Sequence, residues 1–278
     1  MISSTLLLAF LPLVLAKSKS KSIYMDFSTY DSSNPDNTAQ AFLANNTIII
    51  NNYTVDSTSD PNSRTYTAAN VDIADGYLTL KVSGGTANGS SVPSAAIQTN
   101  DTNILYGTFK TTAIASKVPG VCHGFFTYKN DCQESDIEIL TSHFTTGNDR
   151  ITPGLQLTNQ ATSCNSSQNT RDAIPYPQDP TAAAHEYTLE WSRKSTKYYF
   201  DGALIATMDT NVPYVPSAFL WNSWSSGNVN WTSGPPTEDA ILRISKIDIK
   251  YTTSSAQRTF GTTLSTLVLI PLLWWALV

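Results

Sequence analysis

Hydrophobic positions in this chain come in short runs and do not follow the spacing of a helix. No window sustains an apolar period of about 3.6 residues, and runs rich in Val, Ile, Thr, Tyr and Phe alternate with Gly, Pro, Asn and Ser. The pattern predicts strands at 22–27, 46–54, 71–83, 94–99, 104–115, 119–128, 133–141, 152–160, 185–192, 196–208, 216–224 and 240–252. Many short strands with no helix between them predict an all-β fold, an antiparallel β-sandwich. The polar segments 28–45 and 161–184 are predicted to be loops.

Both ends of the chain carry apolar segments that lie outside this pattern. Residues 1–16 end in Val14-Leu15-Ala16, a small-residue cleavage pattern typical of a secretory signal peptide. Residues 264–278 are apolar apart from Thr and Ser and follow a short polar spacer, as in the attachment signal of a glycosylphosphatidylinositol (GPI) anchor. We expect 253–278 to be this signal, Ser254 the attachment residue, and 17–252 one folded domain. A C-terminal transmembrane helix is the alternative.

Composition narrows the range of partners. The net charge of −5 gives no basic surface for a nucleic acid, so no such partner is expected. The sequence has no Cys-x-x-Cys pair, His cluster or phosphate-binding glycine loop, so neither a metal nor another cofactor is expected. We expect a secreted, cell-surface monomer that meets the membrane only through its lipid anchor. Six sequons predict a glycosylated surface, at Asn45, Asn52, Asn88, Asn100, Asn165 and Asn230.

Three cysteines in an oxidising compartment predict one disulfide and one free thiol. If 133–140 pairs antiparallel with 152–160, Cys132 and Cys164 lie at the same end of the sheet. This favours a Cys132–Cys164 bond, with Cys122 buried on strand 119–128. A Cys122–Cys132 bond is the alternative.

The candidate chemistry lies in Glu134-Ser135-Asp136-Ile137-Glu138, inside a predicted strand. Side chains at i, i+2 and i+4 share one face of a strand, so three carboxyls project together. Such a row of like charges is unfavourable for folding alone. A retaining glycosidase needs two carboxyl groups about 5–5.5 Å apart, one as nucleophile and one as acid/base. A solvated strand face is the alternative interpretation.

The surroundings of this motif resemble glycoside hydrolase family 16, and within it the bacterial lichenases and fungal cell-wall members. The similarity spans roughly residues 70–251, with the motifs in the family's order. They are Asp75-Gly-Tyr-Leu-Thr-Leu80, Tyr106-Gly107, Gly120-Val-Cys-His-Gly-Phe-Phe-Thr-Tyr128, Glu134-Ser-Asp-Ile-Glu-Ile-Leu140, His185-Glu-Tyr-Thr-Leu-Glu-Trp191, Tyr198-Tyr-Phe-Asp-Gly202 and Asn222-Ser-Trp224, followed by Trp231.

The resemblance implies a jelly roll of the concanavalin A type, with a carbohydrate cleft on its concave sheet bordered by the loops 28–45 and 161–184. It makes Glu134 the nucleophile, Glu138 the acid/base and Asp136 a support for Glu134. The substrate implied is a β-1,3- or mixed β-1,3/1,4-glucan of a cell wall. The residues expected to bind substrate are Phe126, Tyr128, Asn222, Trp224 and Trp231.

Two other functions stay open. The same site could join glucan or chitin chains by transglycosylation, and the same fold could serve as a non-catalytic carbohydrate-binding or adhesion module. The single residue between Asp136 and Glu138 is typical of the family's unbulged branch, while Ser135 and Ser223 depart from that branch's pattern. His123 and His185 are predicted to be structural; His143 is too, with the cleft rim as the alternative.

Overall fold

The computed structural model describes residues 20–34 and 36–254. The predicted signal peptide and the apolar segment 264–278 lie outside these residues. Within the described part of the chain, no helix is long and apolar enough to cross a membrane.

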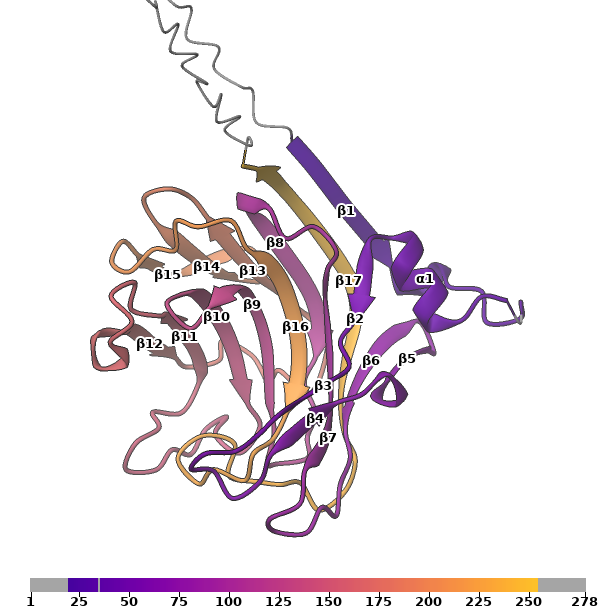
Figure 1. Cartoon of the computed structure of the whole chain (residues 1–278), viewed down its shortest axis with the longest axis horizontal. Helices are drawn as coiled ribbons and strands as arrows, with labels where there is room; N and C mark the ends of the chain where they lie inside the picture. Colours follow the sequence, from indigo (N-terminus) through magenta and orange to yellow (C-terminus); the bar gives the residue numbers. More distant parts are fainter. Residues whose placement is uncertain (1–19, 35, 255–278) are drawn as a thin grey trace, which may run out of the picture.

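Two curved β-sheets form a sandwich (Figure 1). The order of the eight-stranded sheet is β15 (Ala203–Met208), β14 (Thr196–Phe200), β13 (His185–Trp191), β8 (Ile104–Ile114), β17 (Ala240–Thr253), β6 (Tyr77–Val82) and β5 (Val71–Ala74), with β1 (Ser20–Asp26) also paired to β17. The order of the nine-stranded sheet is β12 (Thr170–Ile174), β11 (Leu155–Asn159), β10 (Gln133–Leu140), β9 (Cys122–Asn130), β16 (Ala218–Trp224), β7 (Val92–Thr99), β4 (Arg64–Tyr66) and β3 (Tyr53–Val55), with β2 (Ile48–Ile50) also paired to β7.

The predicted all-β sandwich is confirmed, and each of the predicted strand segments contains a strand. The segments 71–83 and 196–208 are hairpins, because Asp75-Gly76 and Asp201-Gly202 adopt positive φ and turn the chain between two strands. The sequence pattern missed β4 and β12, which are short and polar.

One pair of strands departs from the predicted antiparallel arrangement, since β4 and β7 pair in parallel. Parallel neighbours need a crossover between them. Here the chain leaves β4, forms β5 and β6 in the other sheet, and returns as β7.

The segment 28–45 contains a helix, α1 (Ala39–Asn45), which the sequence pattern had assigned to a loop. Thr38 caps its first turn by accepting a hydrogen bond from the Ala41 N–H, and Leu43 is buried in the core. The helix packs beside β2 and β5 at one edge of the sandwich (Figure 1). The prediction that 28–45 borders the cleft is therefore wrong for the residues that the structure describes, since none of these lines the cleft described below.

Aromatic side chains hold the two sheets together. The rings of Phe109 on β8 and Phe219 on β16 stack with centroids 4.4 Å apart. Beside them, the buried indole N–H of Trp221 donates to Thr111 Oγ1 at 2.8 Å. These contacts fix β16, and with it the outer face of the nine-stranded sheet, relative to the eight-stranded sheet.

Both serines that depart from the family pattern point into the core, where each has a polar partner. The Ser135 and Tyr198 hydroxyls are 2.9 Å apart, and Tyr198 donates onward to Asn159 Oδ1 at 3.0 Å. Ser223 Oγ lies 2.9 Å from His123 Nδ1. Burial lowers the pKa of His123 to about 3, so its ring is neutral, as a structural histidine requires. The departures are thus matched by polar residues, Tyr198 on the facing sheet and His123 on a neighbouring strand.

We predict that Ser135→Ala lowers the free energy of unfolding by about 1–3 kcal/mol, because it removes a partner from a buried tyrosine hydroxyl. Urea denaturation followed by tryptophan fluorescence measures this change. Ser59→Ala, at an exposed position, is the matched control and should change stability by less than about 0.5 kcal/mol. Equal stability of the two variants would contradict the role assigned to the buried pair.

Candidate active site

The candidate site is a cleft of about 540 Å³ on the outer face of the nine-stranded sheet. The alternation along β10 turns Ser135, Ile137 and Ile139 into the core. The carboxyls of Glu134, Asp136 and Glu138 therefore all line the cleft. The rest of the lining comes from Tyr53, Val55, Arg64, Tyr66, Ala96, Gly124, Phe126, Tyr128, Asp131, Gln160, Ser166, Leu220, Asn222 and Trp224.

Strand register sets which side chains face the carboxyls. Opposite β10, strand β9 places Tyr128 beside Glu134, Phe126 beside Asp136, and Gly124 beside Glu138.

On its other side, Gly124 faces Asn222 of β16. A Cβ at position 124 would lie 2.6 Å from Asn222 Oδ1, so glycine is required for this amide to lie on the cleft floor. Within the described residues Asn222 Oδ1 is buried without a hydrogen-bond partner, which leaves it available to a ligand in the cleft.

The central carboxyl, Asp136, is the most deeply buried of the three, at 3% exposed. Burial raises its pKa well above the ordinary value, and the adjacent Glu134 and Glu138 raise it further. These effects favour a protonated Asp136 that donates to Glu134. Burial also raises the pKa of Glu134, and the hydrogen bond from Asp136 opposes that rise.

A chain of amides holds Asp136 from the loop after β11. Gln160 Nε2 donates to Asp136 Oδ2 at 3.2 Å, and Asn169 Nδ2 donates to Gln160 Oε1. Asn169 Oδ1 in turn accepts from the Ala161 N–H at 2.8 Å. The position of Asp136 thus depends on the conformation of residues 160–169.

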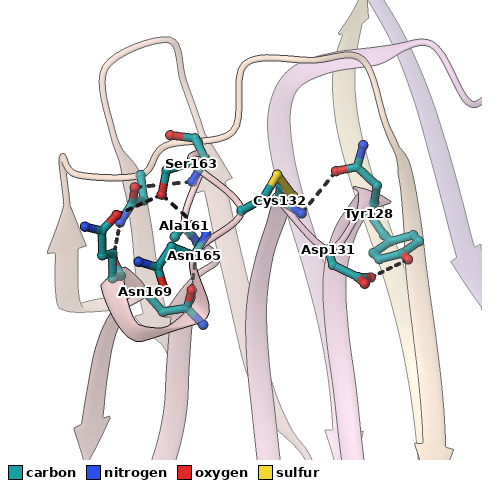
Figure 2. The surroundings of a disulfide bond; sticks show 12 residues. Tyr128, Asp131, Cys132, Ala161, Ser163, Asn165 and Asn169 are labelled. Atoms are coloured by element: carbon teal, nitrogen blue, oxygen red, sulfur yellow. Dashed lines mark hydrogen bonds between the residues drawn. A yellow bond between two sulfur atoms is a disulfide. The ribbon is translucent and has the colours of Figure 1, made fainter.

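The disulfide fastens this loop to the turn before β10. The predicted Cys132–Cys164 bond is confirmed and Cys122 is a buried free thiol, so the alternative Cys122–Cys132 pairing is wrong. Figure 2 shows the bond between Cys132 and the loop that carries Ser163, Asn165 and Asn169. The predicted bordering loop 161–184 does reach the cleft, through Ser166.

Glu138, at the other end of the row, accepts two hydrogen bonds on one oxygen. Cys122 Sγ lies 3.2 Å from Glu138 Oε1, and Trp231 Nε1 lies 3.4 Å from the same atom. Burial raises the pKa of Glu138, while these two donors, Arg171 and Arg64 act in the opposite direction.

The predicted substrate residues fall in two groups. Phe126, Tyr128, Asn222 and Trp224 line the cleft, where the family resemblance placed them. Trp231 instead lines an adjoining pocket of about 340 Å³, together with Gln156 and Arg171, and meets the cleft through Glu138.

Several cleft residues were not predicted from the sequence. Arg64 holds its guanidinium 4.3 Å from the centroid of the Trp224 ring, so one face of this indole is covered by a cation. Tyr53 comes from β3, and Arg64 and Tyr66 come from β4. For the two residues on β4, the alternation in Arg64-Thr65-Tyr66 was the only signal in the sequence. Gln160 and Asn169 lie in a segment that carries no recognisable motif.

None of the histidines lines the cleft. His143 has its ring nitrogens within hydrogen-bonding distance of Thr146 O and Ser233 Oγ, so the alternative of a rim position is wrong. His185 Nδ1 is 2.7 Å from Asp201 Oδ2, as expected of a structural residue. Among residues 20–34 and 36–254, no group of three or more His, Cys, Asp or Glu side chains is arranged to hold a metal ion.

Comparisons with known proteins agree with this geometry. The sequence profile of the glycosyl hydrolases family 16 matches residues 54–251. A β-glucanase of Bacillus amyloliquefaciens is 30% identical over 130 residues, which are 45% of this chain and 50% of that protein. The chain thus spans about half the length of the curated relatives it matches.

Solved structures share the fold. The β-glucanase of Bacillus licheniformis superimposes with a TM-score of 0.62 at 20% identity, over 84% of this chain and 98% of that one. A Crh5 transglycosylase solved with NAG gives a TM-score of 0.55 at 15% identity, over 84% of each chain. Because the family profile covers most of the sequence, the chain belongs to glycosyl hydrolase family 16.

We predict that Asp136→Leu moves the acid limb of a pH–kcat/KM profile for glycoside hydrolysis to higher pH by about 1–2 units. A hydrogen bond to ionised Glu134 lowers its pKa, so losing the bond raises that pKa by the worth of one charge-assisted bond. Asp136→Asn, which stays neutral and keeps an N–H donor, should move the limb less.

Asp131→Asn provides a control of opposite sign. The Asp131 carboxylate raises the pKa of Glu134, so removing its charge should move the same limb to lower pH. An acid limb in Asp136→Leu that stays in place or moves to lower pH would contradict the donor role of Asp136.

Proposed function

We propose that this protein is a retaining endo-glycosidase that acts on cell-wall β-glucan with β-1,3 or mixed β-1,3/1,4 linkages. The observation that carries the proposal is the row of three carboxyls on the floor of an open cleft, with Asp136 buried between the partly buried Glu134 and Glu138. Membership of glycosyl hydrolase family 16 and similarity to Bacillus β-glucanases support a glucan substrate.

The arrangement suits a double-displacement reaction. Glu134 attacks the anomeric carbon as its bond to the leaving oxygen breaks, while Glu138 gives that oxygen a proton; a glycosyl–Glu134 ester and a shortened glucan result. Glu138, now ionised, takes a proton from water, and the water oxygen displaces Glu134. Neutral Asp136 assists by donating to the Glu134 carboxylate, which stabilises it both as nucleophile and as leaving group.

The remaining cleft residues suit an uncharged polysaccharide. Tyr53, Phe126 and Tyr128 offer aromatic surface for sugar C–H groups, while Asn222 Oδ1 offers a hydrogen-bond acceptor. Trp224 is available to a sugar on the face that Arg64 does not cover.

Transglycosylation of glucan or chitin chains is the second candidate. It is supported by the pocket on the far side of Glu138, lined by Trp231, Gln156 and Arg171, where an acceptor sugar could replace water. The fold shared with the Crh5 transglycosylase is compatible with it. A non-catalytic binding module, the candidate from another class, would bind glucan without turnover.

We expect Glu134→Ala to lose glucan cleavage by at least about 10³-fold, because the attacking group is gone. Azide can then enter from the opposite face and should give a glycosyl azide of inverted configuration. Glu138→Ala should spare substrates whose leaving groups need no proton, and azide should give a product of retained configuration. Product stereochemistry is read by NMR.

Glu238→Ala, an exposed carboxylate outside the cleft, is the control for this pair and should keep full activity. A retained product from Glu134→Ala and an inverted product from Glu138→Ala would mean that the nucleophile and the acid/base are assigned the wrong way round. Glucan binding by the unmodified protein without hydrolysis or chain transfer would support the binding module instead.

We further propose that the protein is secreted, N-glycosylated and held at the cell surface by a GPI anchor at Ser254. Two features support this: the disulfide, which persists in oxidising compartments, and the exposure of all six sequon asparagines. Ser254 follows directly on β17, so an anchor there would meet the sandwich at the end of one strand.

Phosphatidylinositol-specific lipase should therefore release the protein from intact cells into the medium. Mass spectrometry of the released form should find a C-terminal peptide that ends at Ser254 and carries the glycolipid remnant. A mature peptide that contains Val278 would exclude the anchor.

A further inference from the structure

Cys122 lies on the cleft side of β9, next to the carboxyl assigned as acid/base. In the strand register it sits between Leu140 of β10 and Trp224 of β16. Its side chain is fully buried in a small apolar cluster with Leu140 and Ile151, against which Trp231 also packs. The thiol is therefore shielded from solvent and is not part of the disulfide.

The polar contact of this thiol is with Glu138. Cys122 Sγ is 3.2 Å from Oε1 of Glu138, and the indole nitrogen of Trp231 is 3.4 Å from the same oxygen. Burial raises the pKa of the thiol, and the adjacent Glu138 carboxyl raises it further, so the thiol keeps its proton and acts as a donor. An indole N–H can only donate. Oε1 is thus held as an acceptor from two sides.

We propose that Cys122 is a positioning residue for the acid/base, acting with Trp231 to keep Oε1 of Glu138 unprotonated and fixed. The exchangeable proton is then confined to Oε2, the oxygen left free to meet the leaving group. The assignment of Glu138 as acid/base rests on the proposed function, whereas the two contacts do not.

The same contacts suit both halves of the reaction. Glu138 must hold a proton in the first half and be ionised in the second. Burial among Glu134 and Asp136 favours the protonated form, while the donors on Oε1, with Arg64 from β4 and Arg171 from β12, favour the ionised form. Cys122 supplies part of this balance without adding a charge to the cleft.

The test measures the pKa of Glu138 directly, by ¹³C NMR titration of protein labelled at the glutamate δ-carbons. Glu138→Gln identifies the resonance. Cys122→Val keeps an apolar side chain in the cluster, one methyl group larger than cysteine, and has no donor, so it should raise the pKa of Glu138 by about 0.5–1 unit, as expected for loss of one weak donor to an ionised group. Cys122→Ser keeps a donor and should stay closer to the unmodified protein.

Two further variants separate this role from packing. Trp231→Phe removes the other donor without changing β9 and should raise the pKa of Glu138 in the same direction. Ile151→Val loosens the same apolar cluster without touching the carboxyl, so it should lower the melting temperature and leave this pKa in place.

An unchanged pKa of Glu138 in Cys122→Val, or an equal shift in Ile151→Val, would overturn the proposal. In the unmodified enzyme the basic limb of kcat/KM should follow the measured pKa, and this limb should move to higher pH in Cys122→Val. If the unmodified protein cleaves no glycoside but the NMR shift is present, the proposed function fails and the positioning contact stands.

Discussion

The candidate site depends on keeping three carboxyl groups together on one strand, one of them buried and two partly buried. Each carboxyl would be costly to ionise alone in such a place, and its two carboxyl neighbours add to that cost. The molecule deals with this by giving each carboxyl a different environment. Asp136 is deepest and accepts a hydrogen bond from the Gln160 amide. Glu134 accepts a hydrogen bond from Asp136, and Glu138 accepts two hydrogen bonds on one oxygen. Distinct environments on an otherwise regular strand separate the roles of chemically similar groups.

Keeping those environments in place requires contributions from both sides of β10. On one side, Gly124 leaves room for Asn222 and places Glu138 at an open floor. On the other side, the disulfide-fastened loop supplies Asn169 and Gln160. Beneath the carboxyls, Phe109, Phe219 and Trp221 lock the sheet that carries them to its partner. The cleft is therefore a property of the packed sandwich, and β10 alone would not specify it.

Most of the fold could be predicted from the sequence, because successive side chains of a β-strand point to opposite faces and so give the sequence a period of two. The three carboxyls on one strand face were found this way, whereas Phe126, Tyr128 and Asn222 were expected from the resemblance to glycoside hydrolase family 16. Two kinds of feature could not be predicted. β4 is too short to show a period, and its parallel pairing depends on a crossover through the other sheet. Three contacts in the site join residues far apart in sequence, so no local pattern predicts them. They are those of Arg64 with Trp224, Gln160 with Asp136, and Cys122 with Glu138. α1 was missed because only one of its residues, Leu43, is buried, so it shows no apolar period.

The pairing of β1 with β17 has a mechanical consequence. β17 pairs with β8 along one edge and with β6 and β1 along the other, so it is an interior strand of its sheet. The described residues end directly after it. A pull along its axis from residue 254 would load many hydrogen bonds at once, in shear, instead of opening them one by one. That load would fall on the eight-stranded sheet, while the carboxyls belong to the other sheet. The end of β17 and the cleft thus lie on separate sheets, and a pull on β17 need not distort the cleft.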